Sequence, residues 1–252
     1  MCTALIAINA IPEQPLLILH NRDEFYSRPS KPLSWWAEGV LAGRDLQSCG
    51  TWFGVNRHGS FCFVTNYRDP SLARENARSR GLLVSEFLTK NIAIDEASKL
   101  LEKSSDNYNP FNIVYGCHDQ TIFYSSQSKK TTKLTTGIYG LSNAYLDTPW
   151  PKVQRGKKLL NQALANNAEE EAFWSILKDS SRAPKSELPS TGIPVELESV
   201  LSSLFVASPD YGTRSSTILK INRGGLIQFT ERRFSCLQKL EGEASFQFKT
   251  PL

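Results

Sequence analysis

The sequence has few of the features that mark extracellular, metal-binding or membrane-spanning proteins. Its 252 residues include only five cysteines, an odd number, and no two of them have CxxC spacing. This argues against a disulfide framework and a zinc site, and it fits a reducing compartment. No apolar run approaches the ~18 residues that a transmembrane helix needs. The first residues also lack the basic segment of a signal peptide. We therefore expect a cytoplasmic protein without a transmembrane segment, and the sequence leaves an association with an organelle open.

Charge and glycine patterns exclude further classes. The 29 basic and 25 acidic residues give a net charge of +4, and the basic patches are not interleaved with aromatic residues as in a nucleic-acid-binding stripe. No glycine-rich phosphate loop follows a predicted strand. The small positive excess favours anionic small molecules as partners. No linker-like tract interrupts the chain, so we expect one domain over residues 1–252. Nothing in the sequence indicates an oligomeric state.

Hydrophobic periodicity predicts strands first, helices next and strands last. The predicted strands cover residues 3–10, 16–20, 52–56, 61–66, 111–115, 121–125, 216–221, 226–231 and 246–248. The predicted helices cover 81–102, 151–165 and 169–177, and 178–194 has the composition of a loop. This order predicts an α+β fold with antiparallel sheets rather than a βαβ alternation.

The first two predicted strands form a hairpin that places the N-terminus beside charged residues. If the turn centres near Glu13, paired positions sum to about 26, because residues in an antiparallel ladder face each other in register. Cys2 then lies opposite the stretch from Arg22 to Glu24.

Cys2 is the strongest candidate for a catalytic residue. Removal of Met1 would give Cys2 a free α-amine with an ordinary pKa of ~7.7–8.0. Such an amine is a general base within reach of its own thiol, as in N-terminal threonine nucleophiles. The alternative is a small buried residue that starts a strand. A retained Met1 would block the amine.

Other polar residues are candidates for supporting roles. Asp23 could hold and polarise the Cys2 amine, and Arg22 could stabilise the thiolate or a substrate carboxylate. Asn66 and Asn143 could donate to an oxyanion. Each of these residues has a structural alternative as a turn, cap or surface residue.

Arg214, the histidines and the tryptophans remain as further candidates. Arg214 precedes an apolar strand, where it could bind an anionic substrate group, support the cysteine or be a solvated loop residue. His20 ends a strand near Cys2, but the spacing of the histidines, His20, His58 and His118, does not match a zinc site. Four tryptophans could line a pocket for a planar ligand or pack in the core: Trp35, Trp36, Trp52 and Trp150.

Several short motifs, taken in order, resemble the Transport and Golgi organisation protein 2 family, also called the NRDE family. They are Cys2-Thr3, Asn21-Arg22-Asp23-Glu24, Gly50-Thr51-Trp52-Phe53-Gly54-Val55-Asn56, Thr65-Asn66-Tyr67-Arg68, Gly81-Leu82-Leu83, Leu141-Ser142-Asn143 and Arg214-Ser215-Ser216-Thr217. The resemblance implies a four-layer αββα sandwich similar to N-terminal-nucleophile hydrolases, in particular choloylglycine hydrolase and penicillin V acylase.

The resemblance also implies roles for individual residues. Cys2 matches the nucleophile and Asp23 the aspartate that contacts the terminal amine. Asn66 and Asn143 match two asparagines near the nucleophile, and Arg214 matches an arginine late in the chain. One position departs from the pattern: the hydrolases carry an arginine where this chain has His20. Arg22 faces the same way along the strand and could replace it.

Two functions follow from these observations. The first is an N-terminal cysteine amide hydrolase or acyl transferase that acts on a small acylated or anionic molecule and needs no metal or organic cofactor. The alternative is a non-catalytic carrier of haem, acyl-CoA or a lipid on the same fold. Members of the family that this sequence resembles are linked to Golgi organisation, lipid metabolism and haem trafficking. A scaffold for other proteins is a third interpretation, but no partner surface is marked.

Overall fold

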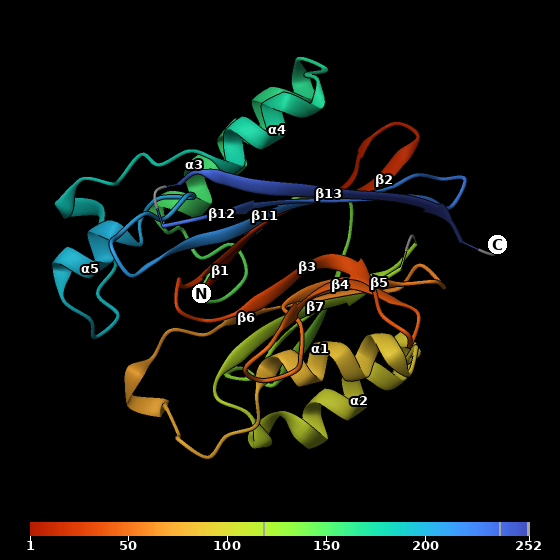
Figure 1. Ribbon diagram of the computed structural model, residues 1–252, viewed down its shortest axis with the longest axis horizontal. Coiled ribbons are helices and arrows are strands. Elements are labelled where there is room, and N and C mark those ends of the chain that lie inside the picture. Colours follow the sequence, from red (N-terminus) through yellow and green to blue (C-terminus); the bar gives the residue numbers. More distant parts are fainter. Residues whose placement is uncertain (118, 237, 251–252) are drawn as a thin grey trace.

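The computed structural model describes residues 1–117, 119–236 and 238–250. Two antiparallel sheets stack face to face, and helices cover their outer sides (Figure 1). In spatial order, the first sheet consists of β10 (Gly137–Leu141), β1 (Cys2–Ile11), β2 (Gln14–Phe25), β11 (Tyr211–Ile221), β12 (Leu226–Phe234) and β13 (Leu240–Lys249). The second consists of β3 (Ser30–Trp35), β4 (Val40–Asp45), β5 (Phe53–Asn56), β6 (Phe61–Asn66), β7 (Phe111–Gly116), β8 (Thr121–Ser125) and β9 (Lys130–Leu134).

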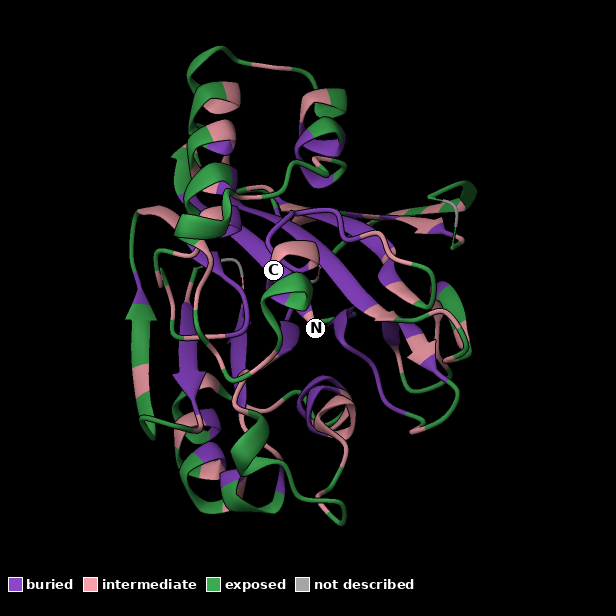
Figure 2. Ribbon diagram, turned by 90° about the vertical axis from the view of Figure 1, so that its left-hand side faces the viewer, coloured by how far each residue is buried: buried purple, intermediate pink, exposed green. Residues whose placement is uncertain are grey.

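Three apolar clusters join four layers, as the αββα prediction requires. The cluster between the sheets includes Ala4 and Ile6 of β1 together with Phe53, Phe63 and Phe229. A second cluster joins the outer face of the second sheet to α1 (Arg80–Thr89) and α2 (Ile94–Ser104). A third joins the first sheet to α3 (Pro151–Ala165) and α4 (Glu170–Leu177). Buried residues accordingly concentrate in the strands and on the inner sides of the helices (Figure 2).

The N-terminal hairpin has the predicted strand pairing, but its register is shifted by two residues, because paired positions sum to 24 rather than about 26. Cys2 pairs with Arg22, and the register holds as far as Ile8 and Leu16 before an irregularity close to the turn. Because successive side chains of a strand point to opposite faces, Cys2 shares the inner face of β1 with Ala4 and Ile6. The prediction that Cys2 lies opposite the stretch starting at Arg22 is confirmed.

The single helix predicted over residues 81–102 is wrong. The segment forms two helices, α1 and α2, which are separated by residues 90–93. Asn91 has a left-handed backbone conformation, with φ of 46°, and asparagine tolerates this conformation better than most residues. The break turns the chain, and both helices pack on the same sheet.

Several elements were not predicted because their sequences are polar or interrupted by glycine. The edge strands β3 and β9 contain few buried side chains, so an apolar pattern is lacking. β4 and β10 contain glycine, and α5 (Val195–Val200) follows directly on the predicted loop. β13 is longer than predicted, because small and polar residues alternate along it.

Within the described residues, no helix is long and apolar enough to cross a membrane. The predicted cytoplasmic location stays a prediction.

Candidate active site

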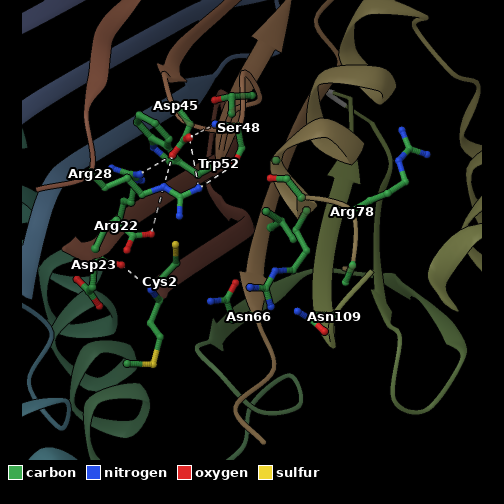
Figure 3. Close-up of a pocket in the computed structure, with 18 residues that line it drawn as sticks. Cys2, Arg22, Asp23, Arg28, Asp45, Ser48, Trp52, Asn66, Arg78 and Asn109 are labelled. Carbon is green, nitrogen blue, oxygen red and sulfur yellow. Dashed lines mark hydrogen bonds and ion pairs between the residues drawn. The ribbon is translucent and has the colours of Figure 1, made fainter. Parts of the chain in front are cut away.

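A cavity of about 370 Å³ opens beside the N-terminus, at one end of the gap between the sheets. Cys2 and Arg22 line it from the first sheet, Trp52 and Asn66 from the second sheet and its loops, and Arg80 from the start of α1. In Figure 3, Cys2 lies between Asp23 and Asn66. Two sheets and a helix therefore converge on the thiol.

The N-terminal amine has a dedicated set of partners. The amine of Met1 donates hydrogen bonds to the main-chain carbonyl of Asp23 and to the hydroxyl of Tyr211, the latter at 2.7 Å. The amide of Asp23 donates back to the carbonyl of Met1 at 2.6 Å. Burial lowers the pKa of this amine below its ordinary value, which favours a neutral amine, the form that accepts a proton.

The Cys2 thiol is nearly enclosed, with 7% of the residue exposed. Burial raises the pKa of this thiol, and the adjacent amine and Arg22 counteract that rise. A thiol with a raised pKa needs a base to become a nucleophile. An N-terminal amine beside it meets that need.

Asp23 and Lys152 are two buried groups of opposite charge that influence each other's ionisation without an ion pair between them. The carboxylate of Asp23 accepts a hydrogen bond from Thr213 at 2.7 Å through Oδ1, and its Oδ2 has no hydrogen-bond partner among the described residues. Lys152 is 2% exposed, and its Nζ is likewise without a partner in the described structure. Burial raises the pKa of Asp23 and lowers that of Lys152 to about 8, and each charge opposes the shift in the other.

Arg68 adds a further buried cation behind Asp23. Its Nη1 pairs with Glu198 of α5 at 2.6 Å, and its guanidinium lies 4.6 Å from the centroid of the Trp150 ring. Its Nε and Nη2 are buried and lack partners in the described part of the chain. The carboxylate of Asp23 therefore faces two cations that are not fully hydrogen bonded.

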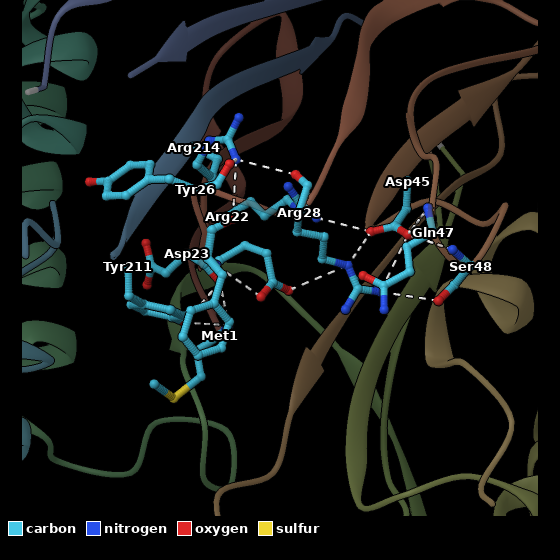
Figure 4. A network of polar contacts seen from close by, with 12 residues as sticks. Met1, Arg22, Asp23, Tyr26, Arg28, Asp45, Gln47, Ser48, Tyr211 and Arg214 are labelled. Atoms are coloured by element: carbon cyan, nitrogen blue, oxygen red, sulfur yellow. Dashed lines mark hydrogen bonds and ion pairs between the residues drawn. The ribbon is translucent and has the colours of Figure 1, made fainter. Parts of the chain in front are cut away.

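Arg22 is held in a layered arrangement beside Cys2. Its guanidinium lies 4.2 Å from the centroid of the Trp52 ring and pairs with Asp45 at 3.1 Å. Asp45 also accepts a hydrogen bond from Arg28 at 2.6 Å and one from the amide of Ser48 at 2.7 Å (Figure 4). These bonds outweigh burial and keep the pKa of Asp45 below its ordinary value. The charge of Arg22 is thus matched by a carboxylate.

The two predicted asparagines have different surroundings. Asn66 ends β6 and lines the cavity, and its side-chain amide makes no hydrogen bond within the described structure. Asn143 is fully buried, and its side-chain amide donates to the carbonyl of Asn66 at 3.0 Å. The main-chain carbonyl of Asn143 accepts a hydrogen bond from the main-chain amide of Arg68 at 2.7 Å. Asn143 therefore ties the chain that follows β10 to the end of β6 and does not line the cavity.

Arg214 is not brought to Cys2. Its Nη1 donates to the carbonyls of Phe25, Tyr26 and Arg28 at 2.9–3.2 Å (Figure 4). It sits at a register shift of β11, between Thr213 and Ser215. Its observed contacts therefore brace the loop that carries Arg28 into the cavity.

His20 and the tryptophans do not form a shared ligand pocket. His20 is fully buried, with its ring centroid 5.2 Å from that of Phe53 and 5.4 Å from that of Phe63. Trp52 is the one predicted tryptophan at the described cavity wall, whereas Trp35 and Trp36 stack under Arg57 and Arg44 elsewhere. His58 is exposed, and His118 lies outside the described residues. Among these residues, no cluster of three or more acidic, histidine or cysteine side chains could hold a metal ion.

Two glycines fix the start of α1 against the cavity. A Cβ atom on Gly50 would lie 2.3 Å from the carbonyl carbon of Gly81, so the two backbones are in direct contact. The amide of Thr51 also donates to the carbonyl of Gly81 at 3.1 Å. This close approach gives a physical reason for glycine at both positions and sets the place of Arg80.

Sequence reasoning missed Lys152, Tyr211, Thr213 and Arg80. These residues come from segments far from Cys2 in sequence, so their proximity depends on the assembled fold. Lys152 carries one signal that could have drawn attention. A lysine in the first turn of a helix is disfavoured by the helix dipole, and Lys152 directly follows the Pro151 that begins α3.

Comparison with known proteins gives one consistent family and fold. Residues 1–236 match the family described as Transport and Golgi organisation 2. The chain is 35% identical to the Transport and Golgi organization protein 2 homolog of Bos taurus and 34% identical to that of Homo sapiens, and each alignment covers 86% of both chains. Its fold is similar to that of a C2A mutant of the conjugated bile acid hydrolase from Clostridium perfringens, with a TM-score of 0.54 over 100% of this chain and 97% of that chain. At 12% identity, this likeness shows the fold alone.

Proposed function

The chain belongs to the Transport and Golgi organisation 2 family, and from its N-terminal-nucleophile hydrolase fold and the surroundings of Cys2 we propose that it is an amide hydrolase or acyl transferase. The observation that carries this proposal is the position of Cys2. Its thiol lines a cavity, and the Met1 amine one residue before it is held by the main-chain carbonyl of Asp23 and the hydroxyl of Tyr211. Fold alone does not transfer function, so the proposal depends on this geometry.

Catalysis begins with removal of Met1, which exposes the α-amine of Cys2. The amine takes the thiol proton while Sγ attacks the acyl carbonyl carbon, and a tetrahedral oxyanion forms. When the intermediate collapses, the bond from the carbonyl carbon to the leaving amine breaks, and the protonated α-amine gives that amine its proton. The acyl group is then held as a thioester on Cys2.

Water or an acceptor amine completes the cycle. The α-amine accepts a proton from the incoming nucleophile, which attacks the thioester carbonyl. The carbon–sulfur bond breaks, and the thiolate recovers the proton. This sequence needs no metal or organic cofactor.

The surrounding residues have separate roles in this proposal. Asn66 donates its side-chain amide to the oxyanion, and Asn143 is a positioning residue that holds the end of β6. Once Met1 is removed, the main-chain carbonyl of Asp23 orients the α-amine of Cys2, and Lys152 keeps the buried carboxylate of Asp23 ionised. Arg22 lowers the cost of the thiolate next to it. Arg214 is a positioning residue for the loop that carries Arg28.

A panel of activated thioesters and anilides tests the proposal. The wild-type protein, freed of Met1, is expected to hydrolyse at least one of them. Cys2→Ser should lower the rate by about 100-fold or more, the usual scale for loss of a nucleophile or its activation. Cys49→Ser is the matched control, because Cys49 is exposed and outside the cavity wall. Equal rates for the wild type and Cys2→Ser would contradict the proposal.

Carriage of haem, acyl-CoA or a lipid stays a prediction from the sequence. His20 cannot serve as an accessible haem ligand in the described fold, because it is fully buried between two phenylalanines. Cys2 is the cysteine at the cavity that could bind haem iron through its thiolate. A shift of the haem Soret band on binding that is lost in Cys2→Ser would support the carrier function.

A further inference from the structure

The cavity beside Cys2 contains more cations than its own carboxylates neutralise. Arg22 and Arg28 both pair with Asp45, and Arg28 also lies 3.9 Å from Glu24. Asp23 faces Lys152 and Arg68 on the other side of the sheet. Arg78 and Arg80 also line the cavity, and neither makes an ion pair with a described residue. The excess positive charge therefore comes from the segment that enters α1.

Of these two arginines, Arg80 is the more buried, and it lines the same cavity as Cys2. Arg78 is exposed and points away from Cys2 (Figure 3). Arg80 is half-buried, and its Nη1 donates to the carbonyl of Pro110 at 3.0 Å. Burial lowers the pKa of Arg80, and Cys2 and Glu24 are the acidic groups that oppose this change. The thiol and the guanidinium line the same cavity.

The position of Arg80 is set by the fold rather than by a flexible loop. Gly81, the next residue, is in backbone contact with Gly50 and hydrogen bonds to Thr51. The first turn of α1 contains no acidic side chain, and Ser79 makes no side-chain cap. Nothing in this turn competes with an incoming anion for the guanidinium.

We propose that Arg80 is the anion-binding residue of the cavity and that the substrate carries a carboxylate or another oxyanion close to the carbonyl attacked by Cys2. Of the two arginines that the sequence suggested for this role, Arg22 pairs with a carboxylate, Asp45, and Arg214 donates to three main-chain carbonyls. Arg80 donates to one main-chain carbonyl and has no carboxylate partner among the described residues. A guanidinium binds planar oxyanions through paired hydrogen bonds. This assignment rests on the proposed function, because it places the anion relative to Cys2 as the nucleophile.

Alkylation of Cys2 by two small reagents tests the assignment without knowledge of the substrate. Iodoacetate carries a carboxylate and iodoacetamide is its neutral counterpart, and peptide mass spectrometry measures the rate of each reagent at each cysteine. The quantity of interest is the iodoacetate-to-iodoacetamide rate ratio at Cys2, divided by the same ratio at the exposed Cys49. This normalisation removes the intrinsic difference between the reagents.

The variants separate Arg80 from the general charge of the cavity. In the wild type we expect a normalised ratio of about 10, which corresponds to the energy of one charge-assisted hydrogen bond. R80Q should bring it close to one, R80K should retain most of it, and R78Q, which removes the same charge from the same cavity wall, should leave it unchanged. Thermal unfolding of each variant confirms that the fold is kept.

Each outcome has a distinct meaning. If Cys2 reacts readily but its normalised ratio is one, or if R80Q and R78Q lower the ratio equally, the assignment of Arg80 is overturned and the proposed nucleophile stands. If Cys2 reacts with neither reagent while Cys49 reacts with both, the proposed function fails and the substrate assignment fails with it.

Discussion

Lys152 and Asp23 are buried charges of opposite sign, and each leaves one polar atom without a hydrogen-bond partner in the described structure. Lys152 is the cation that most favours the ionised form of Asp23, and Asp23 is the anion that most favours the ionised form of Lys152. A buried charge that lacks full hydrogen bonding is costly. Because this pair lies behind the N-terminal amine, we interpret its cost as part of the catalytic arrangement.

Lys152→Met should change the pH dependence of Cys2 acylation. In the wild type, Lys152 loses its proton as the pH rises through about 8, and the rate should fall on that alkaline side. Without the ammonium the pKa of Asp23 rises further, so the rate near neutral pH should fall.

Lys152→Arg is the matched control for this prediction. Arginine stays protonated throughout this range, so it should retain the neutral rate and remove the decline near pH 8. A profile that keeps its alkaline limb in both variants would show that Lys152 does not act on the site.

Asp23→Asn should destabilise the protein and lower the acylation rate. Asparagine keeps an oxygen that can accept from Thr213, but it removes the anion that favours the charged form of buried Lys152. At pH 7 we expect a loss of about 3 kcal/mol in the free energy of unfolding, because removing one partner leaves a buried charge uncompensated.

Urea unfolding at pH 7 measures this loss, and Asp210→Asn is the control because Asp210 is exposed. Unchanged stability together with unchanged acylation in Asp23→Asn would contradict both halves of the prediction.

His20→Phe should remove an acid-sensitive contribution to stability. Burial lowers the pKa of His20 to about 3, below its unfolded value. Between these values the unfolded chain binds more protons, so this contribution is complete above the unfolded pKa and is lost as the pH falls. From pH 6.5 to 5 the loss is about 2 kcal/mol by linkage.

Between pH 5 and 6.5, the contribution of Glu231 to stability changes with pH in the opposite direction, because burial raises the pKa of Glu231 to about 7. The test is therefore the difference between His20→Phe and the wild type in urea unfolding at the two pH values. His58→Phe should show no such difference, because His58 is exposed. A pH-independent difference for His20→Phe would mean that the imidazole is not held neutral.

Gly50→Ala should displace the start of α1. Its Cβ atom would lie 2.3 Å from the Gly81 carbonyl carbon, which is backbone and cannot rotate away. We expect a loss of about 1–3 kcal/mol in the free energy of unfolding, typical of overpacking, together with a lower iodoacetate-to-iodoacetamide ratio at Cys2.

Gly224→Ala is the control, because the nearest atom to its Cβ is 3.5 Å away. Unchanged stability and ratio in Gly50→Ala would show that the contact with Gly81 does not position Arg80.

The sequence predicted the parts of the site that depend on local geometry. The length of the N-terminal hairpin determines which residues face Cys2, so its proximity to Arg22 followed from residue spacing. Asn66 could be placed because it ends a strand with a clear apolar pattern. These inferences needed no knowledge of how the sheets pack.

Other features of the site depend on tertiary contacts that spacing does not encode. Lys152 is carried to Asp23 by the packing of α3 on the first sheet, and Arg80 is carried to the cavity by the glycine contact. For Asn143 and Arg214, the residue type indicated hydrogen-bonding capacity but not its direction. Both use that capacity on main-chain carbonyls.

The intact mass of the purified native protein, before and after reaction with a thiol-reactive acyl probe, tests the central claim most directly. We expect the mass to lack one methionine, and one acyl group to be added rapidly at Cys2 and not at the buried Cys62. Retention of Met1, or labelling of Cys2 no faster than of the exposed Cys49, would contradict the assignment of Cys2 as an N-terminal nucleophile.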